Sequence, residues 1–159
     1  MYQPREQKIR YFLFSQYLAD GIRTTLEIVL PVIILAQFGY LEAGFSVALG
    51  ALCVSIADAP GPVEHKKNGM LYGNLFVFLM ALLTGFFNGN ALAMGILVGA
   101  SSFFFTMISV YGARAAAVGT AALLAMILRM TKISSPTESL EEALLILAGG
   151  IWYLLVALI

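Results

Sequence analysis

The sequence is poor in charged and chemically reactive side chains. Only 11% of its 159 residues are charged, and it contains one cysteine, one histidine and one tryptophan. The single cysteine, Cys53, excludes an internal disulfide and is most simply a small packing residue. Nine basic and nine acidic residues cancel, so no net positive field favours nucleic acid. The sequence has no metal-ligand cluster, no nucleophile beside a base and no glycine-rich phosphate loop. We therefore expect no catalytic residue, no metal, no cofactor and no nucleic-acid partner.

Apolar residues are what the chain has in abundance. They make up 60% of the sequence, and the mean hydropathy is +0.90, which indicates a lipid environment. A spanning helix needs roughly 20 apolar residues, and backbone in lipid must satisfy its own hydrogen bonds. The predicted fold is therefore an all-α polytopic membrane protein with six transmembrane helices, over residues 21–39, 41–57, 69–88, 91–110, 112–130 and 139–159.

The first 20 residues differ from the six apolar runs. The stretch REQKIRYFLFSQYLAD mixes Arg, Lys and Gln with aromatic residues, a composition typical of an amphipathic helix at the membrane interface. We expect residues 1–20 to form this interfacial helix and residues 21–159 to form the six-helix module. The chain ends on GGIWYLLVALI without a basic residue after the last run, and we expect the module to be part of a longer transporter.

The distribution of basic residues predicts the orientation in the membrane. With the N-terminus in the cytoplasm, Arg129 and Lys132 lie outside, and seven basic residues lie at or inside the inner boundary: Arg5, Lys8, Arg10, Arg23, Lys66, Lys67 and Arg114. This excess predicts that both termini are cytoplasmic.

The first apolar run carries charges where lipid is expected. Asp20, Arg23, Thr24, Glu27 and Pro31 recur at steps of three or four, so they share one face of a helix. An ionisable residue near a helix centre costs about 2.5–3.5 kcal/mol on insertion scales. Two interpretations remain open: a self-neutralising ion pair between Arg23 and Glu27, or a water-lined transport pathway beside a proline kink at Pro31.

A second polar stretch, IADAPGPVEHKKNG, follows the second run. Asp58 and Arg114 are predicted at the same cytoplasmic boundary, where they could pair or line the pathway. The loop is predicted to be a stiff turn whose His65, Lys66 and Lys67 either form the cytoplasmic mouth of a pathway or are ordinary solvated and topogenic residues.

Small residues recur in the fourth and fifth runs. Gly95 and Gly99 form a GxxxG pair, and Gly112 and Ala116 follow. Small residues let helices approach closely in lipid, so this pattern predicts a packing interface between these two runs.

The stretch KISSPTESLEE predicts the start of a helix. Ser135 is a predicted N-cap with Pro136 in the first helical position and Glu138 three residues after the cap. Glu141 and Glu142 would complement the positive end of the helix dipole.

Two stretches, LGALCVSIADAPGPVEHKKNGML and VYGARAAAVGTAALLAMIL, resemble the N-terminal membrane module of the fusaric acid resistance (FUSC, YccS-like) family of bacterial inner-membrane proteins, a group related to aromatic acid exporters. The resemblance covers essentially the whole chain and implies a six-helix module in the inner membrane that exports organic or aromatic carboxylates. The expected partners are therefore the lipid bilayer, a small organic anion and further copies of the chain in a homo-oligomer. A structural anchor for a cytosolic domain and an anion channel are the alternatives.

Overall fold

The computed structural model describes residues 16–58, 63–131 and 135–158. Their regular structure is entirely helical and consists of α2 (Gln16–Gln37), α3 (Leu41–Ile56), α4 (Val63–Phe87), α5 (Ala91–Ser109), α6 (Ala113–Met130) and α7 (Pro136–Leu158). Each of the six predicted apolar runs corresponds to one helix, so the predicted all-α class is confirmed. Residues 1–15 of the predicted interfacial helix lie outside the described residues, and that helix stays a prediction.

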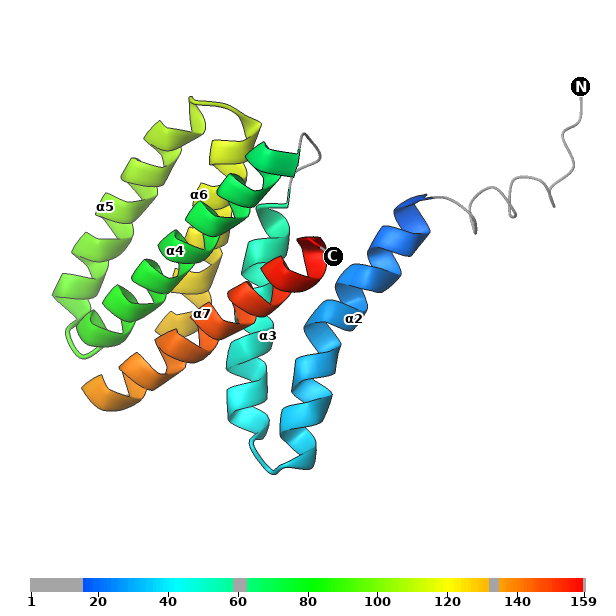
Figure 1. Cartoon of the computed structure of the whole chain (residues 1–159). Helices are drawn as coiled ribbons and strands as arrows, with labels where there is room; N and C mark the ends of the chain where they lie inside the picture. The colour runs from blue at the N-terminus through cyan, green and yellow to red at the C-terminus, as the bar shows by residue number, and fades with distance from the viewer. Residues whose placement is uncertain (1–15, 59–62, 132–134, 159) are drawn as a thin grey trace, which may run out of the picture.

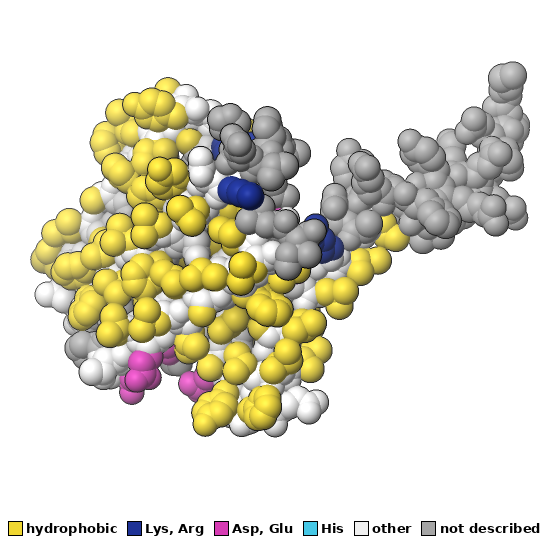
Figure 2. All heavy atoms as spheres, in the orientation of Figure 1, with side chains coloured by type: hydrophobic (Ala, Val, Ile, Leu, Met, Phe, Trp, Pro, Cys, Tyr) yellow, Lys and Arg dark blue, Asp and Glu magenta, His cyan; other side chains and the backbone are white. Residues whose placement is uncertain are grey.

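The helices run back and forth between two ends of a bundle (Figure 1). One end holds the start of α2, the end of α3, the start of α4, the α5–α6 turn and the end of α7. We call it the basic end because Arg23, Lys67 and Arg114 lie there. The opposite end, which we call the acidic end, holds the α2–α3 turn and the start of α7. Figure 2 shows the acidic side chains gathered at that lower edge, with apolar side chains covering the surface between the two ends.

The helix boundaries follow from the turn residues. Gly39 and Gly112 adopt positive φ values of 82° and 124°, which side chains rarely tolerate, and each one separates two helices. The side chain of Asn90 caps α5 by accepting a hydrogen bond from the N–H of Leu92 at 3.1 Å. The predicted capping box of α7 is confirmed, because the N–H of Ser135 donates to Oε2 of Glu138 at 3.0 Å.

One predicted loop is shorter than expected. Helix α4 begins at Val63, so residues 65–67 belong to its first turns and not to a connecting loop. The prediction was wrong because it placed the helix start at the first continuous apolar residue, although the polar stretch Val63–Asn68 has no residue that opposes a helix. Pro60, Gly61 and Pro62 lie outside the described residues.

Helices α3 and α7 cross closely at the centre of the bundle. A Cβ added at Gly50 would collide with the backbone carbonyl of Ile146, and one added at Gly149 would collide with that of Val47. The core around this crossing consists mostly of small residues from four helices, namely Cys53, Val77, Ala81, Ala121, Ala125, Ala143 and Ile146. Small side chains let these helix backbones approach one another, as membrane helices commonly do.

The predicted interface through Gly95, Gly99, Gly112 and Ala116 is corrected by the structure. Helix α5 does pack on α6, but an added Cβ at Gly95 or Gly99 would have no neighbour within 4 Å, and Gly112 lies in the turn before α6. Gly119 makes the close approach instead, since its added Cβ would lie 3.2 Å from Cβ of Phe105. Gly95 and Gly99 are exposed on α5, and spacing alone does not show which face of a helix is covered.

Four helices are long and apolar enough to cross a membrane. They cover Lys67–Phe87, Ala91–Ser109, Ala113–Met130 and Thr137–Ala157. Only 17% of the apolar window in α5 is buried within the chain, which suits a helix surrounded by lipid. Helix α3 is apolar but has 16 residues, and α2 carries Arg23 and Glu27 near its middle.

Candidate functional site

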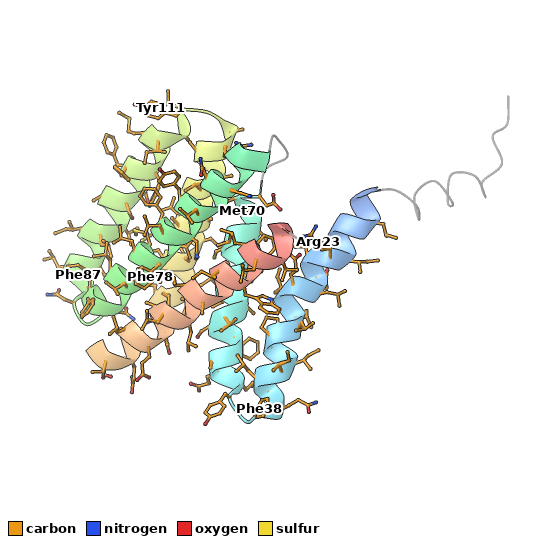
Figure 3. The ribbon with its side chains drawn as sticks, in the orientation of Figure 1. Arg23, Phe38, Met70, Phe78, Phe87 and Tyr111 are labelled. Atoms are coloured by element: carbon orange, nitrogen blue, oxygen red, sulfur yellow. The ribbon has the colours of Figure 1, made fainter. Side chains whose placement is uncertain are left out.

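An ion pair on α2 forms the first part of the candidate site. Nε of Arg23 donates to Oε1 of Glu27 at 2.8 Å, as their spacing of four residues allows. The two side chains differ in burial, because that of Glu27 is only 4% exposed whereas that of Arg23 is 45% exposed. Arg23 also donates through Nη2 to the backbone carbonyl of Val156, which ties α2 to the last turns of α7. Figure 3 shows Arg23 on α2 beside the C-terminal end of α7.

Tyr153 extends this pair into a cluster that joins three helices. Its hydroxyl donates to Oδ2 of Asp58, just beyond α3, at 3.2 Å. The Thr24 side chain also hydrogen-bonds Tyr153, and Glu27 lies near enough to interact with it electrostatically. We call Arg23, Thr24, Glu27, Asp58 and Tyr153 the inner cluster. Sequence reasoning missed Tyr153 because it lies in an uninterrupted apolar run, where one tyrosine gives no signal of a polar contact.

Pro31 removes a backbone hydrogen bond of α2 next to the inner cluster. It lies inside α2, which continues to Gln37, and it has no N–H to donate to the carbonyl of Glu27 one turn earlier. The backbone at Glu27 therefore keeps an acceptor that an ordinary helix would use. Pro31 itself is buried, so this acceptor lies on the protein side of α2 and not on its lipid side.

The other predicted residues of the basic end belong to α4 and α6. Arg114 lies along the first turns of α4, because a Cβ at Gly69 would lie 3.0 Å from its Cδ. The predicted pairing of Asp58 with Arg114 stays a prediction, and the structure adds a contact that was not predicted, between Asp58 and Tyr153. Lys67 is exposed on α4, and the side chains of His65 and Lys66 lie outside the described residues.

An apolar groove opens beside the inner cluster, between α2 and α7. Its volume is about 450 Å³, and it is lined by Ile22, Arg23, Leu26, Glu27, Leu30, Trp152 and Val156. Five of these side chains are apolar, and the two charged ones are the ion pair at one end of the groove. We call this space the lateral groove, because it lies between two helices at the side of the bundle.

A second ion pair, which was not predicted from the sequence, lies at the acidic end. Arg129 of α6 pairs with Glu142 of α7, and the two side chains are 5% and 14% exposed. The sequence predicted only the side of the membrane for Arg129, the outer one, and that stays a prediction; the structure adds that its side chain is buried. Only a glycine fits at position 85 beside the pair, since an added Cβ would lie 2.6 Å from Cβ of Ser139 and 3.2 Å from Nη2 of Arg129. The guanidinium of Arg129 is therefore buried beside α4 and α7.

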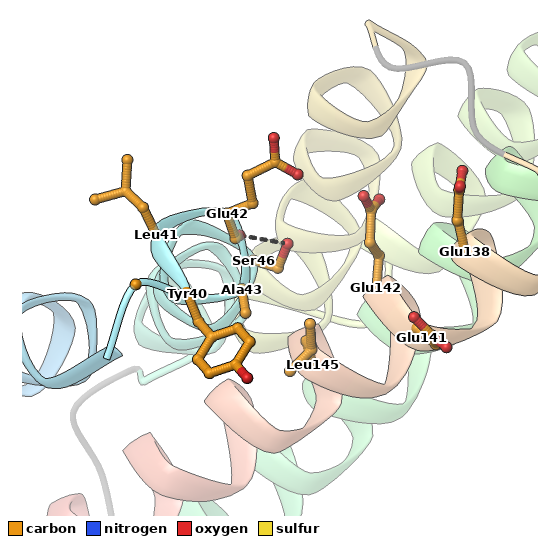
Figure 4. A pocket seen from close by; sticks show the side chains of 10 residues that line it. Tyr40, Leu41, Glu42, Ala43, Ser46, Glu138, Glu141, Glu142 and Leu145 are labelled. Atoms are coloured by element: carbon orange, nitrogen blue, oxygen red, sulfur yellow. Dashed lines mark hydrogen bonds between the residues drawn. The ribbon is translucent and has the colours of Figure 1, made fainter. Parts of the chain in front are cut away.

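Glu142 also faces a groove of about 650 Å³ between the starts of α3 and α7. Three further glutamates line it, Glu42, Glu138 and Glu141, and Figure 4 shows their carboxylates around one opening. Among the described residues, no group of three or more acidic, histidine or cysteine side chains could hold a metal ion. The glutamates of the acidic groove give this end a negative charge.

Four helices long and apolar enough to cross a membrane, with many large apolar side chains exposed on the surface, indicate an integral membrane protein. A family model described as FUSC-like inner membrane protein yccS matches residues 70–159, more than half of the chain. The chain therefore belongs to the family of FUSC-like inner membrane proteins. The matched region includes Tyr153 and the Arg129–Glu142 pair, whereas Arg23, Glu27 and Asp58 precede it. Searches of curated proteins and of solved structures found no match.

Proposed function

We propose that the chain is the membrane part of an inner-membrane exporter of small organic or aromatic carboxylates, with the inner cluster in its pathway. The observation that carries this proposal is Glu27, a carboxylate that is buried in an apolar bundle, paired with Arg23 and close enough to Tyr153 of α7 to interact with it electrostatically. An intramembrane ionisable residue is costly, and in membrane proteins it commonly marks an ion or substrate path. The family match supports a transport-related role.

The proposal includes six membrane-spanning helices with both termini in the cytoplasm. The 22 residues of α2 extend about 33 Å, enough for a hydrocarbon core of about 30 Å. Its charges are tolerable because Glu27 is paired and buried, and Arg23 can reach the interface. Helix α3 extends about 24 Å, a mismatch that local thinning of the bilayer can accommodate at modest cost.

The charge distribution favours an anionic substrate that enters at the basic end. Arg23, Lys67 and Arg114 lie at that end, and Lys66 is the neighbour of Lys67 in sequence. Such a mouth raises the local concentration of anions. The glutamates at the opposite end would disfavour the return of an anion after release.

Flux measurements in vesicles test the proposal against its alternatives. The protein is reconstituted in lipid vesicles, a pH gradient is imposed, and the movement of a panel of aromatic and aliphatic acids is followed. We expect export that depends on the gradient, because a buried carboxylate such as Glu27 suits coupling to protons. Flux without dependence on the gradient would favour a channel, and absence of flux would favour a structural anchor.

A further inference from the structure

We propose that the lateral groove binds an amphipathic anion that reaches it sideways from the surrounding lipid. The apolar body of the ligand packs against Leu26, Leu30 and Trp152, and its anionic group lies beside Arg23. This inference rests on the proposed function and deepens it, because it specifies the chemical class of the substrate and its route to the site.

The lining of the groove fits an apolar body of small-molecule size. The volume of about 450 Å³ lies in the usual range of small-molecule sites, roughly 300–1,000 Å³. Ile22, Leu26, Leu30 and Trp152 are all exposed in the chain, so their apolar surfaces are available to an occupant.

The charged end of the groove supplies a place for one anionic group. Arg23 uses Nε for Glu27 and Nη2 for the carbonyl of Val156, while Nη1 has no partner within the described part of the chain. A guanidinium can donate to several acceptors at once, and its bonds to anions are strong. A carboxylate at Nη1 would therefore bind without displacing Glu27.

The charged and apolar parts of the lateral groove lie at the same membrane depths as the charged and apolar parts of an amphiphile in a bilayer. Arg23 and Leu30 are seven residues apart on α2, which corresponds to about 10 Å along the helix axis. In the proposed topology Arg23 lies near the cytoplasmic interface and Leu30 lies inside the hydrocarbon core. An anionic group at the interface and an apolar body below it match both positions. A strongly hydrated anion without an apolar body would gain little from this lining.

Trp152 allows the proposal to be tested directly, because it is the only tryptophan of the chain and it lines the groove. The protein in phosphatidylcholine vesicles is titrated with bromoundecanoate, whose bromine quenches nearby tryptophan. The matched probe is bromoundecanol, which has the same chain without the charge. We expect saturable quenching by the anion, relieved by unbrominated undecanoate, and a half-saturating concentration about tenfold lower than for the alcohol.

Two pairs of variants separate groove binding from partition into bulk lipid. Leu30→Phe fills the groove and should lower the saturable quenching several-fold, whereas Ile34→Phe, an exposed position of α2 outside the groove, should leave it unchanged. Arg23→Gln should remove the preference for the anion. The double variant Arg23→Gln/Glu27→Gln should do the same without leaving an unpaired buried carboxylate, so it remains informative if the single variant folds poorly.

Quenching that does not saturate, or that is equal for the two probes and for both phenylalanine variants, would overturn the proposal and show that bulk lipid fills the groove. Export measured in the flux assay would stand in that case, with a substrate that enters from water. Conversely, saturable binding without any flux would support the groove and contradict the exporter.

Discussion

The hydroxyl of Tyr153 donates a hydrogen bond to Asp58 at 3.2 Å, although the two residues are 95 positions apart in the sequence. This contact connects the C-terminal part of α7 to the residue that follows α3. The side chain of Thr24, on α2, forms a hydrogen bond with the same hydroxyl. One phenol therefore holds three helices together at the basic end, next to the buried carboxylate of Glu27.

We predict that Tyr153→Phe destabilises the protein while its packing is kept. The ring stays in place and only the hydroxyl is lost, and a hydrogen bond to a charged group contributes about 1.5–3 kcal/mol. The measurement is the melting temperature in detergent. Tyr72→Phe is the matched control, because Tyr72 is exposed on α4. Equal melting temperatures for the two variants would show that the Tyr153 hydroxyl does not stabilise the fold.

The glycines that matter for packing are predicted to be those of the α3–α7 crossing. Gly50→Ala should sharply lower the folded yield, because its Cβ would collide with the carbonyl of Ile146, and a backbone cannot yield as a side chain can. Gly99→Ala should leave the yield unchanged, since nothing lies within 4 Å of the added atom. A loss of yield from Gly99→Ala alone would show that α5 meets a partner, such as a second copy.

Much of the fold was predictable from local signals. The lengths of the apolar runs predicted six helices, and the breaks between the predicted runs fall close to the turns at Gly39, Asn90 and Gly112. The Arg23–Glu27 pair was predictable for the same reason, because both partners lie on one helix and a spacing of four residues brings them together.

The contacts between helices were not predictable in this way. Tyr153 with Asp58, and Arg129 with Glu142, are pairs whose partners come from different helices, and the helix crossings decide which charges meet. The glycines of α5 did not identify the interface between α5 and α6, for a related reason. A stripe of small residues permits close approach but does not choose between a helix and lipid as its neighbour.

The proposed orientation predicts that Lys67 and Glu138 are reached from opposite sides of the membrane. Both residues are exposed, one near each end of the bundle, and the only native cysteine, Cys53, is 1% exposed and should react slowly. In cells, an impermeant thiol reagent applied from the periplasm should label Glu138→Cys and leave Lys67→Cys unlabelled. The reverse pattern would overturn the orientation, and labelling of both would contradict an enclosed six-helix module.

The Arg129–Glu142 pair is predicted to be a stability determinant of the acidic end. Glu142→Gln leaves the guanidinium of Arg129 buried without its carboxylate, and breaking a buried pair in this way costs about 3–5 kcal/mol. The double variant Arg129→Met/Glu142→Leu should recover most of that loss, because it leaves no charge buried. Unfolding in detergent measures both, with Glu141→Gln at the exposed neighbour as the control. Equal stability of Glu142→Gln and Glu141→Gln would show that Arg129 does not depend on its partner.

The Glu27→Gln variant distinguishes a structural role of Glu27 from a functional one, because its partner Arg23 is accessible to solvent and headgroups. Glu27→Gln keeps the size of the side chain and an oxygen acceptor for Nε of Arg23, and the charge left on Arg23 is 45% exposed, so solvent and headgroups can stabilise it. We therefore expect a stability loss of about 1 kcal/mol, the usual limit for an exposed pair.

Export driven by a pH gradient should nevertheless fall at least tenfold, because an amide cannot take up and release a proton. Adding Arg23→Gln should not restore export if Glu27 acts in the pathway, whereas in a purely structural pair the second change would rescue folding and export together. The melting temperature and the flux are therefore measured on the same preparations, and a stable Glu27→Gln protein that exports at the wild-type rate would show that the buried carboxylate serves only the fold.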